Sequence, residues 1–268
     1  MSANNPAEIA EQYATDHNLR IRKETHVRYG GGPDLEPRVD ELLALWGDEA
    51  LLDVGTGPGD FPGRLRSQGH RGRLVGVDLS PGMVEHATAS HPEVEFMQAS
   101  ADTLPFSDAS FDVLTARHML YHVPDVATAL NEFARVLRPG GRFLAVTNAS
   151  GYMGELWDAV AEVVPHEPAL AGLLESRAGS AVFSELNGEE LVRDAFGNVR
   201  VDFLDNALIF PTPGPVLTYL ESMTALQRLS EGDRTRLHTV LSRVLTPRFQ
   251  AGGWHVSKRV AFIQAVRP

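Results

Sequence analysis

The sequence contains no cysteine. Disulfide bonds, thiolate metal sites and a cysteine nucleophile are therefore excluded. Basic residues are also few: 24 lysines and arginines stand against 35 aspartates and glutamates, which gives a net charge of -11. Proteins that bind nucleic acid neutralise its phosphates with a basic surface. The acidic balance thus argues against nucleic acid as the main partner, and also against an anionic membrane surface.

Long apolar runs are missing as well. No stretch approaches the roughly 20 apolar residues that a transmembrane helix needs. Residues 1–6 lack the charged and apolar regions of a secretory signal. We therefore expect a cytoplasmic protein. Its 268 residues, 43% of them hydrophobic, are enough for one or two domains with a large buried core.

The most informative stretch is Leu51–Phe61, which reads LLDVGTGPGDF. A short apolar run typical of a buried strand is followed by Gly55, Gly57 and Gly59, and then by a helical pattern that extends to Gln68. Glycines leave the backbone bare for a ligand, and the start of a helix offers free N–H groups. A strand, a glycine loop and a helix in this order are typical of a nucleotide-binding α/β fold.

The loop departs from two common phosphate-binding patterns. The dinucleotide fingerprint has a third glycine where this chain has Asp60, whose carboxylate would lie beside a pyrophosphate. The Gly-Lys-Ser/Thr of a Walker loop does not follow either. Asp53, at the end of the strand, repels phosphate and attracts a cation. The loop therefore suits a positively charged nucleoside and disfavours a nicotinamide-dependent oxidoreductase; the alternative is a structural turn with chance glycines.

A second strand, Arg73–Asp78, also ends in an acid. In nucleoside-binding βαβ units an acid at this place accepts hydrogen bonds from the ribose hydroxyls. The alternative is an acid that merely flanks the next helix, which Ser80 caps and Pro81 opens.

Strand and helix patterns alternate along the chain, which is typical of a parallel sheet covered on both faces. We predict an α/β fold with a Rossmann-like, seven-stranded, mostly parallel sheet, an N-terminal helical cap and an inserted lid after strand five. Strands are expected at 51–54, 73–78, 94–99, 111–116, 142–147, 199–210 and 256–266, and helices from Pro81 and at 37–46, 61–68, 126–137, 153–164, 185–196, 216–229 and 234–249, with 165–181 irregular.

The same patterns divide the chain into four segments. Residues 1–35 form a cap, 36–148 the cofactor-binding core, 149–198 a variable substrate lid, and 199–268 complete the sheet with two helices. The glycine triplet 30–32 is either a hinge that lets the cap close over a ligand or a plain surface linker.

Four motifs in order and spacing over residues 36–148 resemble the class I S-adenosylmethionine-dependent methyltransferases, specifically the ubiquinone/menaquinone-biosynthesis type and its small-molecule relatives. These motifs are LLDVGTGPG, VGVDLS, DTLPFSDASFD and RVLRPGGRF. The resemblance weakens after Asn148, where such enzymes carry their variable substrate regions.

The resemblance implies a site for S-adenosyl-L-methionine. The glycine loop would hold the methionyl part, with Asp53 near its cationic groups, and Asp78 would bind the ribose. Leu79 would border the adenine, and Ser100 stands at the adenine edge where the family commonly has an acid, so it offers only a weaker, neutral acceptor. The expected cofactor-binding residues are Asp53, Gly55, Thr56, Gly57, Gly59, Asp78, Leu79, Ser100, Ala101, Arg117 and Tyr13.

Methyl transfer from a sulfonium requires aligned reactants and exclusion of water, and a hydroxyl acceptor must also lose a proton to a base. In this fold the segment 117–125 ends near the methyl group. It holds His118 and His122, four residues apart, which would share a face if the segment is helical. We predict that one of them is the catalytic base, with His122 preferred. The alternative is that both pack or line the cofactor without proton transfer.

Other side chains in the covering segments have weaker claims. Aromatic faces there would attract the sulfonium, or would simply pack between helices. Carboxylates suited to a metal are scarce near strands four and five, where only Asp125 and Asn148 are plausible, so we predict no metal. The aromatic candidates are Tyr13, Tyr29, Tyr152 and Trp157. Three histidines are further candidates on the lid side, with solvated surface as the alternative: His17, His26 and His255.

We therefore predict an enzyme that transfers a methyl group to a small-molecule acceptor in metabolite biosynthesis, with oxygen as the favoured target. The missing basic face and the variable segments 1–35 and 149–198 favour a buried small acceptor over RNA or protein. The alternatives are methylation on nitrogen or carbon, or a protein that binds the cofactor without methylating, for example in a cyclisation. The sequence does not indicate the oligomeric state.

Overall fold

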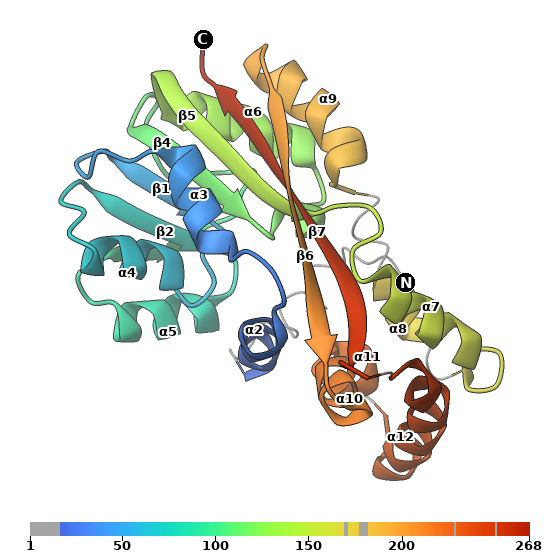
Figure 1. Cartoon of the computed structure of the whole chain (residues 1–268). Helices are drawn as coiled ribbons and strands as arrows, with labels where there is room; N and C mark the ends of the chain where they lie inside the picture. Colours follow the sequence, from blue (N-terminus) through green and yellow to red (C-terminus); the bar gives the residue numbers. More distant parts are fainter. Residues whose placement is uncertain (1–16, 169–170, 177–181, 228, 250) are drawn as a thin grey trace.

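The computed structural model describes residues 17–168, 171–176, 182–227, 229–249 and 251–268. Its strands form one seven-stranded sheet in the order β3-β2-β1-β4-β5-β7-β6 (Figure 1). Neighbouring strands are parallel except at β7, which runs antiparallel to both β5 and β6. The predicted Rossmann-like, mostly parallel sheet is thus confirmed. The strands are β1 (Leu51–Val54), β2 (Leu74–Asp78), β3 (Glu95–Gln98), β4 (Phe111–Arg117), β5 (Leu137–Asn148), β6 (Arg200–Phe210) and β7 (Trp254–Val266).

Helices cover both faces of the sheet (Figure 1). Two helices pack on one face of the sheet, and two other helices pack on its opposite face. The first pair is α3 (Leu35–Leu43) and α4 (Asp60–Ser67), and the second is α6 (Val126–Val136) and α9 (Glu185–Phe196). The other helices are α2 (His17–Tyr29), α5 (Pro81–Ser90), η1 (Leu120–His122), α7 (Gly154–Val163), α8 (Ala171–Ser176), α10 (Pro213–Glu221), α11 (Thr224–Gln227), α12 (Glu231–Leu245) and η4 (Thr246–Arg248).

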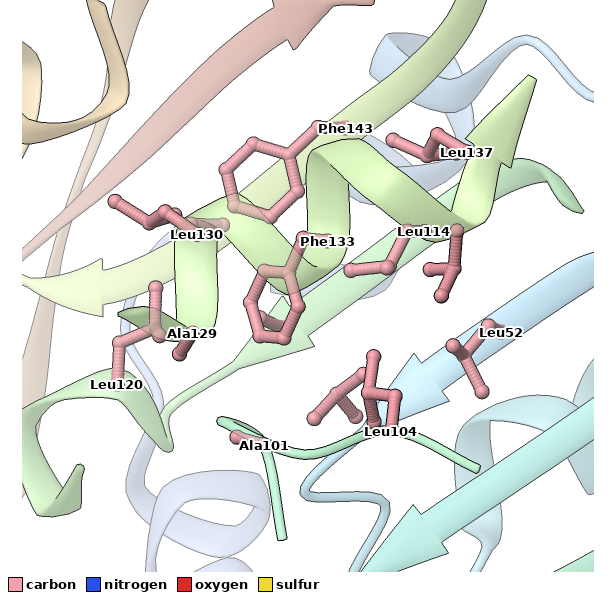
Figure 2. Packing of buried hydrophobic residues seen from close by; sticks show 14 of the residues in the cluster. Leu52, Ala101, Leu104, Leu114, Leu120, Ala129, Leu130, Phe133, Leu137 and Phe143 are labelled. Carbon is pink, nitrogen blue, oxygen red and sulfur yellow. The ribbon is translucent and has the colours of Figure 1, made fainter. Parts of the chain in front are cut away.

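The main core lies between α6, α9 and the sheet. Figure 2 shows Leu130 and Phe133 of α6 next to Leu114 of β4 and Phe143 of β5. The rings of Phe133 and Phe143 are 5.8 Å apart, and Phe143 stacks on Phe196 of α9 at 5.1 Å. Complete burial of one such side chain contributes about 1.5–3 kcal/mol. This packing fixes β1, β4 and β5 side by side, so that their carboxyl ends share one edge.

Strand β5 begins earlier than predicted. It starts at Leu137, directly after α6, instead of at Arg142. Leu137 pairs with Phe111 and Arg142 pairs with Val113, so the chain bulges between these pairs without leaving the sheet. Gly140 permits the bulge because its φ of 77° is left-handed.

Several helix boundaries also differ from the predictions. Helix α3 ends at Leu43 because Ala44 is left-handed, which leaves Trp46 85% exposed instead of buried. The region predicted to be irregular contains α8. The helix expected at 216–229 is two helices, α10 and α11, and the one expected at 234–249 starts at Glu231, where the Ser230 hydroxyl accepts the Asp233 N–H at 3.1 Å.

A second apolar cluster packs around the far ends of β6 and β7, which extend beyond the other strands (Figure 1). Leu208 and Val256 on these strands are fully buried against α7, α10 and α12. Tyr29 and Trp157 also pack here, which supports helix packing as their role. In the described parts of the chain, no helix is both long and apolar enough to cross a bilayer.

The glycine triplet that follows α2 is attached to the edge strand β6. Gly30 forms a β-bridge with Leu208, and the Gly31 N–H donates to the carbonyl of Ala207 at 2.9 Å. A Cβ at Gly31 would lie 2.5 Å from the Ile209 side chain, so only glycine allows this approach. The backbone of Gly30 and Gly31 is therefore paired with strand β6, which argues against a plain surface linker.

Candidate functional site

The expected cofactor-binding residues gather at one edge of the sheet. The glycine loop follows β1, Leu79 follows β2, Ser100 follows β3 and Arg117 ends β4. Because these strands are neighbours and parallel, their carboxyl ends lie side by side. Tyr13 lies outside the described residues.

Asp53 is a buried carboxylate at this edge. It is 3% exposed, and the Thr115 hydroxyl on the neighbouring strand donates a 2.6 Å hydrogen bond to its Oδ1. Burial raises the pKa of Asp53, while the positive charge of Arg117 and the bond from Thr115 act in the opposite direction. A carboxylate with so little access to water attracts a cationic ligand group placed beside it.

The glycine loop needs glycine for two different reasons. Gly55, Gly57 and Gly59 all have left-handed φ values, of 68°, 57° and 81°. A Cβ at Gly55 would lie 2.6 Å from the Met119 side chain, and one at Gly59 would lie 2.6 Å from Phe96. At Gly57 the nearest atom would be 3.8 Å away. Gly55 and Gly59 are therefore required by packing, and Gly57 presents bare backbone. Between them, Thr56 is 8% exposed and donates its N–H to the carbonyl of Val77 at 3.0 Å.

Asp78 ties the glycine loop to the turn after β2. Its carboxylate accepts the N–H of Gly57 at 2.8 Å and the N–H of Ser80 at 2.9 Å. Burial raises the pKa of Asp78, and these backbone bonds oppose the rise. Asp78 does flank the next helix, as the alternative reading held, but it also shapes the loop where the ligand would lie.

The predicted adenine border is formed by the ends of β2 and β3. The Ala99 N–H donates to the carbonyl of Asp78 at 3.0 Å, which brings the Ser100 turn next to the end of β2. Ala101 is 8% exposed, whereas Leu79 is 48% exposed and offers an apolar side chain to a ligand.

Arg117 is already engaged by its own protein. Its guanidinium forms an ion pair with Glu36 of α3 at 2.6 Å and lies 4.4 Å from the centre of the Phe61 ring. Glu36 also pairs with Arg64 of α4 at 3.0 Å. These contacts join α3, α4 and the end of β4 behind the glycine loop.

His118 and His122 do not share a helical face. His118 has a left-handed φ of 53°, and its N–H donates to the carbonyl of Val146 at 2.7 Å. Only Leu120–His122 forms a short 3-10 helix. The segment therefore does not meet the condition for a shared helical face, because His118 directly follows strand β4 and precedes the short helix.

Both histidines are uncharged near neutral pH. Burial lowers the pKa of His118 to about 3, with further lowering by the positive charges of Arg117 and Lys258 among others. Burial also lowers the pKa of His122 to about 4, assisted by Arg22. A neutral imidazole can accept a proton, although a low pKa makes it a weak base.

His26 belongs to the same region, which contradicts its assignment to solvated surface. Its Nε2 lies 3.3 Å from the Tyr152 hydroxyl, and its ring lies 5.9 Å from that of Tyr219. Burial lowers the pKa of His26 to about 4. The spacing of Leu19, Arg22 and His26 along one helical face was the only signal in the sequence that could have indicated this.

Helix α2 closes over the glycine loop and joins it to the C-terminal helices. Leu19 is the residue nearest to the open side of Gly57, and Lys23 forms an ion pair with Asp60 at the start of α4. On the other side, the Arg22 Nη1 donates to the carbonyl of Ser222 at 2.9 Å, and Asn18 exchanges amide hydrogen bonds with Gln227. The described part of the predicted cap segment, residues 17–35, therefore contacts the glycine loop.

Comparisons with known proteins agree with this geometry. Residues 52–145 match the family described as "Methyltransferase domain". The demethylmenaquinone methyltransferase of Lactococcus lactis is 41% identical over 115 residues, which is 41% of this chain and 44% of that protein. The malonyl-[acyl-carrier protein] O-methyltransferase of Serratia marcescens is 28% identical over 246 residues, 90% of this chain and 83% of that protein.

Solved structures share the fold. The crystal structure of the YcgJ protein from Bacillus subtilis aligns with a TM-score of 0.57 at 21% identity, covering 86% of this chain and 97% of that one. Several curated relatives match over a shorter region, and the chain spans about half their length or less.

The fold, the motifs and these matches define a Rossmann-like methyltransferase domain. The chain belongs to the class I S-adenosylmethionine-dependent methyltransferases, as its motifs predicted. S-adenosyl-L-methionine is the methyl donor of this family, and the site fits it. The bare backbone at Gly57 is bonded to the half-buried Asp78, and Asp53 is buried at the end of the preceding strand; these acids suit hydroxyl groups and cationic groups.

Proposed function

We propose that the chain transfers a methyl group from S-adenosyl-L-methionine to an oxygen atom of a small molecule in metabolite biosynthesis. The observation that carries this proposal is the glycine loop, in which the Gly57 N–H is bonded to Asp78 and Asp53 is buried at the end of the preceding strand, at the same sheet edge from which the segment with the neutral His118 and His122 begins. Oxygen as the target is supported by the relative named as a malonyl-[acyl-carrier protein] O-methyltransferase. We also propose a cytoplasmic location, which accords with a chain free of cysteine.

The cofactor, when bound, supplies the electrophilic methyl group. We propose that Asp53 offers negative charge to its cationic part and that Asp78 accepts the ribose hydroxyls. Leu79, Ser100 and Ala101 would border the adenine. In this arrangement Asp78 also holds the Gly57 N–H, so ribose binding and loop geometry depend on one carboxylate.

We propose that a histidine near the end of β4 removes the proton of the acceptor hydroxyl. His118, His122 and the newly found His26 are candidate bases, since burial keeps all three neutral. Their low pKa values match an acceptor hydroxyl that is already acidic, such as a phenol or an enol, better than an alcohol. The hydroxyl of Tyr152 orients His26 through their hydrogen bond.

The covering segments are proposed to enclose the acceptor. Helix α2, from the segment 1–35, contacts Tyr152, from the segment 149–198, through His26. Helix α9, also within 149–198, packs on the sheet through Phe196, so the proposed lid is confined to the first part of that segment.

The proposed function is tested by measuring release of S-adenosylhomocysteine with a panel of phenols, enols and carboxylic acids. Histidine-to-glutamine variants at positions 26, 118 and 122 should bind S-adenosylhomocysteine normally, and at least one should lose about 100-fold or more in turnover. His255→Gln, an exposed site on β7, is the matched control. Near-normal turnover in all three variants would refute the base, and a folded protein that methylates nothing in the panel would count against the activity.

A further inference from the structure

Ring side chains from α2, α10, the segment after β4 and the turn before α7 lie near one another. We call them the ring cluster: His26, His118, Tyr121, His122, Tyr152 and Tyr219. The Tyr152 hydroxyl contacts His26, the His26 ring lies 5.9 Å from Tyr219, and the Tyr121 and His122 rings are 4.6 Å apart. All six side chains are buried or half-buried. Burial keeps the three histidines uncharged at neutral pH and raises the pKa of Tyr152 and Tyr219.

Arg22 borders this cluster from α2, one helical turn before His26. Its Nη1 donates to the carbonyl of Ser222, which fixes the guanidinium group. Its Nη2 is fully buried and has no hydrogen-bond partner among the described residues. The positive charge of Arg22 acts to lower the pKa of His26, His122 and Tyr219, so the guanidinium lies near these three residues.

Lys258 borders the cluster from β7. Lys258 lies two residues from both Val256 and Val260, so the three side chains project from the same face of β7. Val256 and Val260 are 0% and 4% exposed, which shows that this face points inward. The ammonium group is half-buried, and burial lowers its pKa although the charge of Asp34 opposes this. The charge of Lys258 also acts to lower the pKa of His26 and His118, as expected for a cation on this inward face of β7.

These two cations lack the acid partners that other buried cations of the chain possess. Arg64 is paired with Asp40 at 2.8 Å and Arg117 with Glu36 at 2.6 Å. In the described part of the chain, no carboxylate forms an ion pair with Arg22 or Lys258. An unpaired buried charge is costly to the fold. Two half-buried cations without an ion pair near one cluster of rings indicate a partner that comes from outside the chain.

We infer that Arg22 and Lys258 bind an oxyanion, a carboxylate or phosphate group, of the methyl acceptor beside the ring cluster. The inference rests on the proposed function, since it assigns the acceptor class of that site. One side of the Arg22 guanidinium is committed to Ser222, and the buried Nη2 is left to donate to an anionic oxygen. The tyrosine and histidine rings offer flat walls to the organic part of the acceptor.

The test is a calorimetric titration of the full chain, with and without S-adenosylhomocysteine. The probes are 4-hydroxybenzoate, phenyl phosphate and the neutral 4-hydroxybenzamide. The variants are Arg22→Gln and Lys258→Gln. Arg20→Gln and Arg259→Gln are matched controls, because they remove exposed cations from the same helix and the same strand.

At least one anionic probe should bind about tenfold or more tightly than the amide, and each variant should weaken that probe by about tenfold or more. The controls should stay within about twofold of the wild type, as expected for exposed charges. Equal binding of the amide, failure of both anionic probes to bind, or an equal loss in the controls would overturn the inference.

The affinity for S-adenosylhomocysteine separates the two proposals. Arg22→Gln should leave it unchanged; a loss as large as that for the anionic probes would assign Arg22 to the cofactor instead and overturn the inference. If the wild type binds an anionic probe but not S-adenosylhomocysteine, the proposed function fails while the oxyanion site stands.

Discussion

The hydroxyl of Thr115 donates a 2.6 Å hydrogen bond to Asp53 across two neighbouring parallel strands, and both side chains are buried. Thr115→Val keeps the shape and removes the donor. A hydrogen bond to a charged group contributes about 1.5–3 kcal/mol, so the free energy of unfolding should fall by that order. Urea denaturation near neutral pH measures the change. Thr88→Val, on an exposed helix position, is the control, and equal effects of the two substitutions would contradict this role.

Asp78 should govern both the loop and the affinity for the cofactor. Asp78→Ala removes the acceptor of the Gly57 and Ser80 N–H groups. We expect the affinity for S-adenosylhomocysteine to fall by about 100-fold, because charge-assisted bonds contribute about 1.5–3 kcal/mol each. Asp102→Ala removes a nearby exposed acid and should leave the affinity unchanged. A small loss in Asp78→Ala would mean that the carboxylate only flanks the helix.

Gly55 should tolerate no side chain. Gly55→Ala places a Cβ 2.6 Å from Met119 at a left-handed φ of 68°. The backbone alone costs about 1–2 kcal/mol for alanine. Gly151→Ala has a similar φ of 81° but meets nothing within 4 Å, so it isolates the backbone cost. The variant at Gly55 should therefore lose more stability in urea denaturation than the variant at Gly151. Equal losses would show that the loop adjusts around Met119.

Acid should destabilise the fold before the carboxylates become protonated. The pKa values of His26, His118 and His122 lie at about 4, 3 and 4, below the ordinary value of 6.5. At pH values between the lowered pKa and 6.5, each of these histidines binds a proton in the unfolded chain and stays neutral in the folded chain. The free energy of unfolding should thus fall as the pH drops from 6.5 towards 4. The raised pKa values of Asp53 and Asp78 have the opposite effect on the free energy of unfolding. At pH values between the ordinary and the raised pKa of each carboxyl group, the folded chain binds the extra proton.

Urea denaturation at pH 7.5 and pH 5 measures this dependence. His26→Gln should reduce the difference between the two pH values, because one buried imidazole is removed. His255→Gln, which changes an exposed histidine, should not. Stability that is equal at both pH values in the wild type would contradict the burial of these rings.

The sequence predicted those parts of the fold that short-range signals encode. The strand Leu51–Val54 and the helix Glu185–Phe196 have the predicted bounds. The strand is a compact apolar run before the glycine loop. The helix has a capping box at Ser184 and a left-handed glycine at its end. Each of these signals lies within a few residues of the boundary that it sets.

Features that depend on distant contacts were not predictable from the sequence. His26 contacts Tyr152, which lies 126 positions away along the chain. No local pattern reports such a contact, so His26 was read as surface. The same holds for Lys258, whose position near the ring cluster depends on how β7 pairs with β5 and β6.

The central claim is that the loop around Gly57 binds a positively charged adenosyl donor. Its most direct test is calorimetric titration of the full chain with S-adenosylhomocysteine and, separately, with NAD. The account predicts saturable binding of S-adenosylhomocysteine at micromolar affinity and no binding of NAD. A properly folded protein that gives no heat with S-adenosylhomocysteine at millimolar concentration, or that binds NAD equally well, would contradict it.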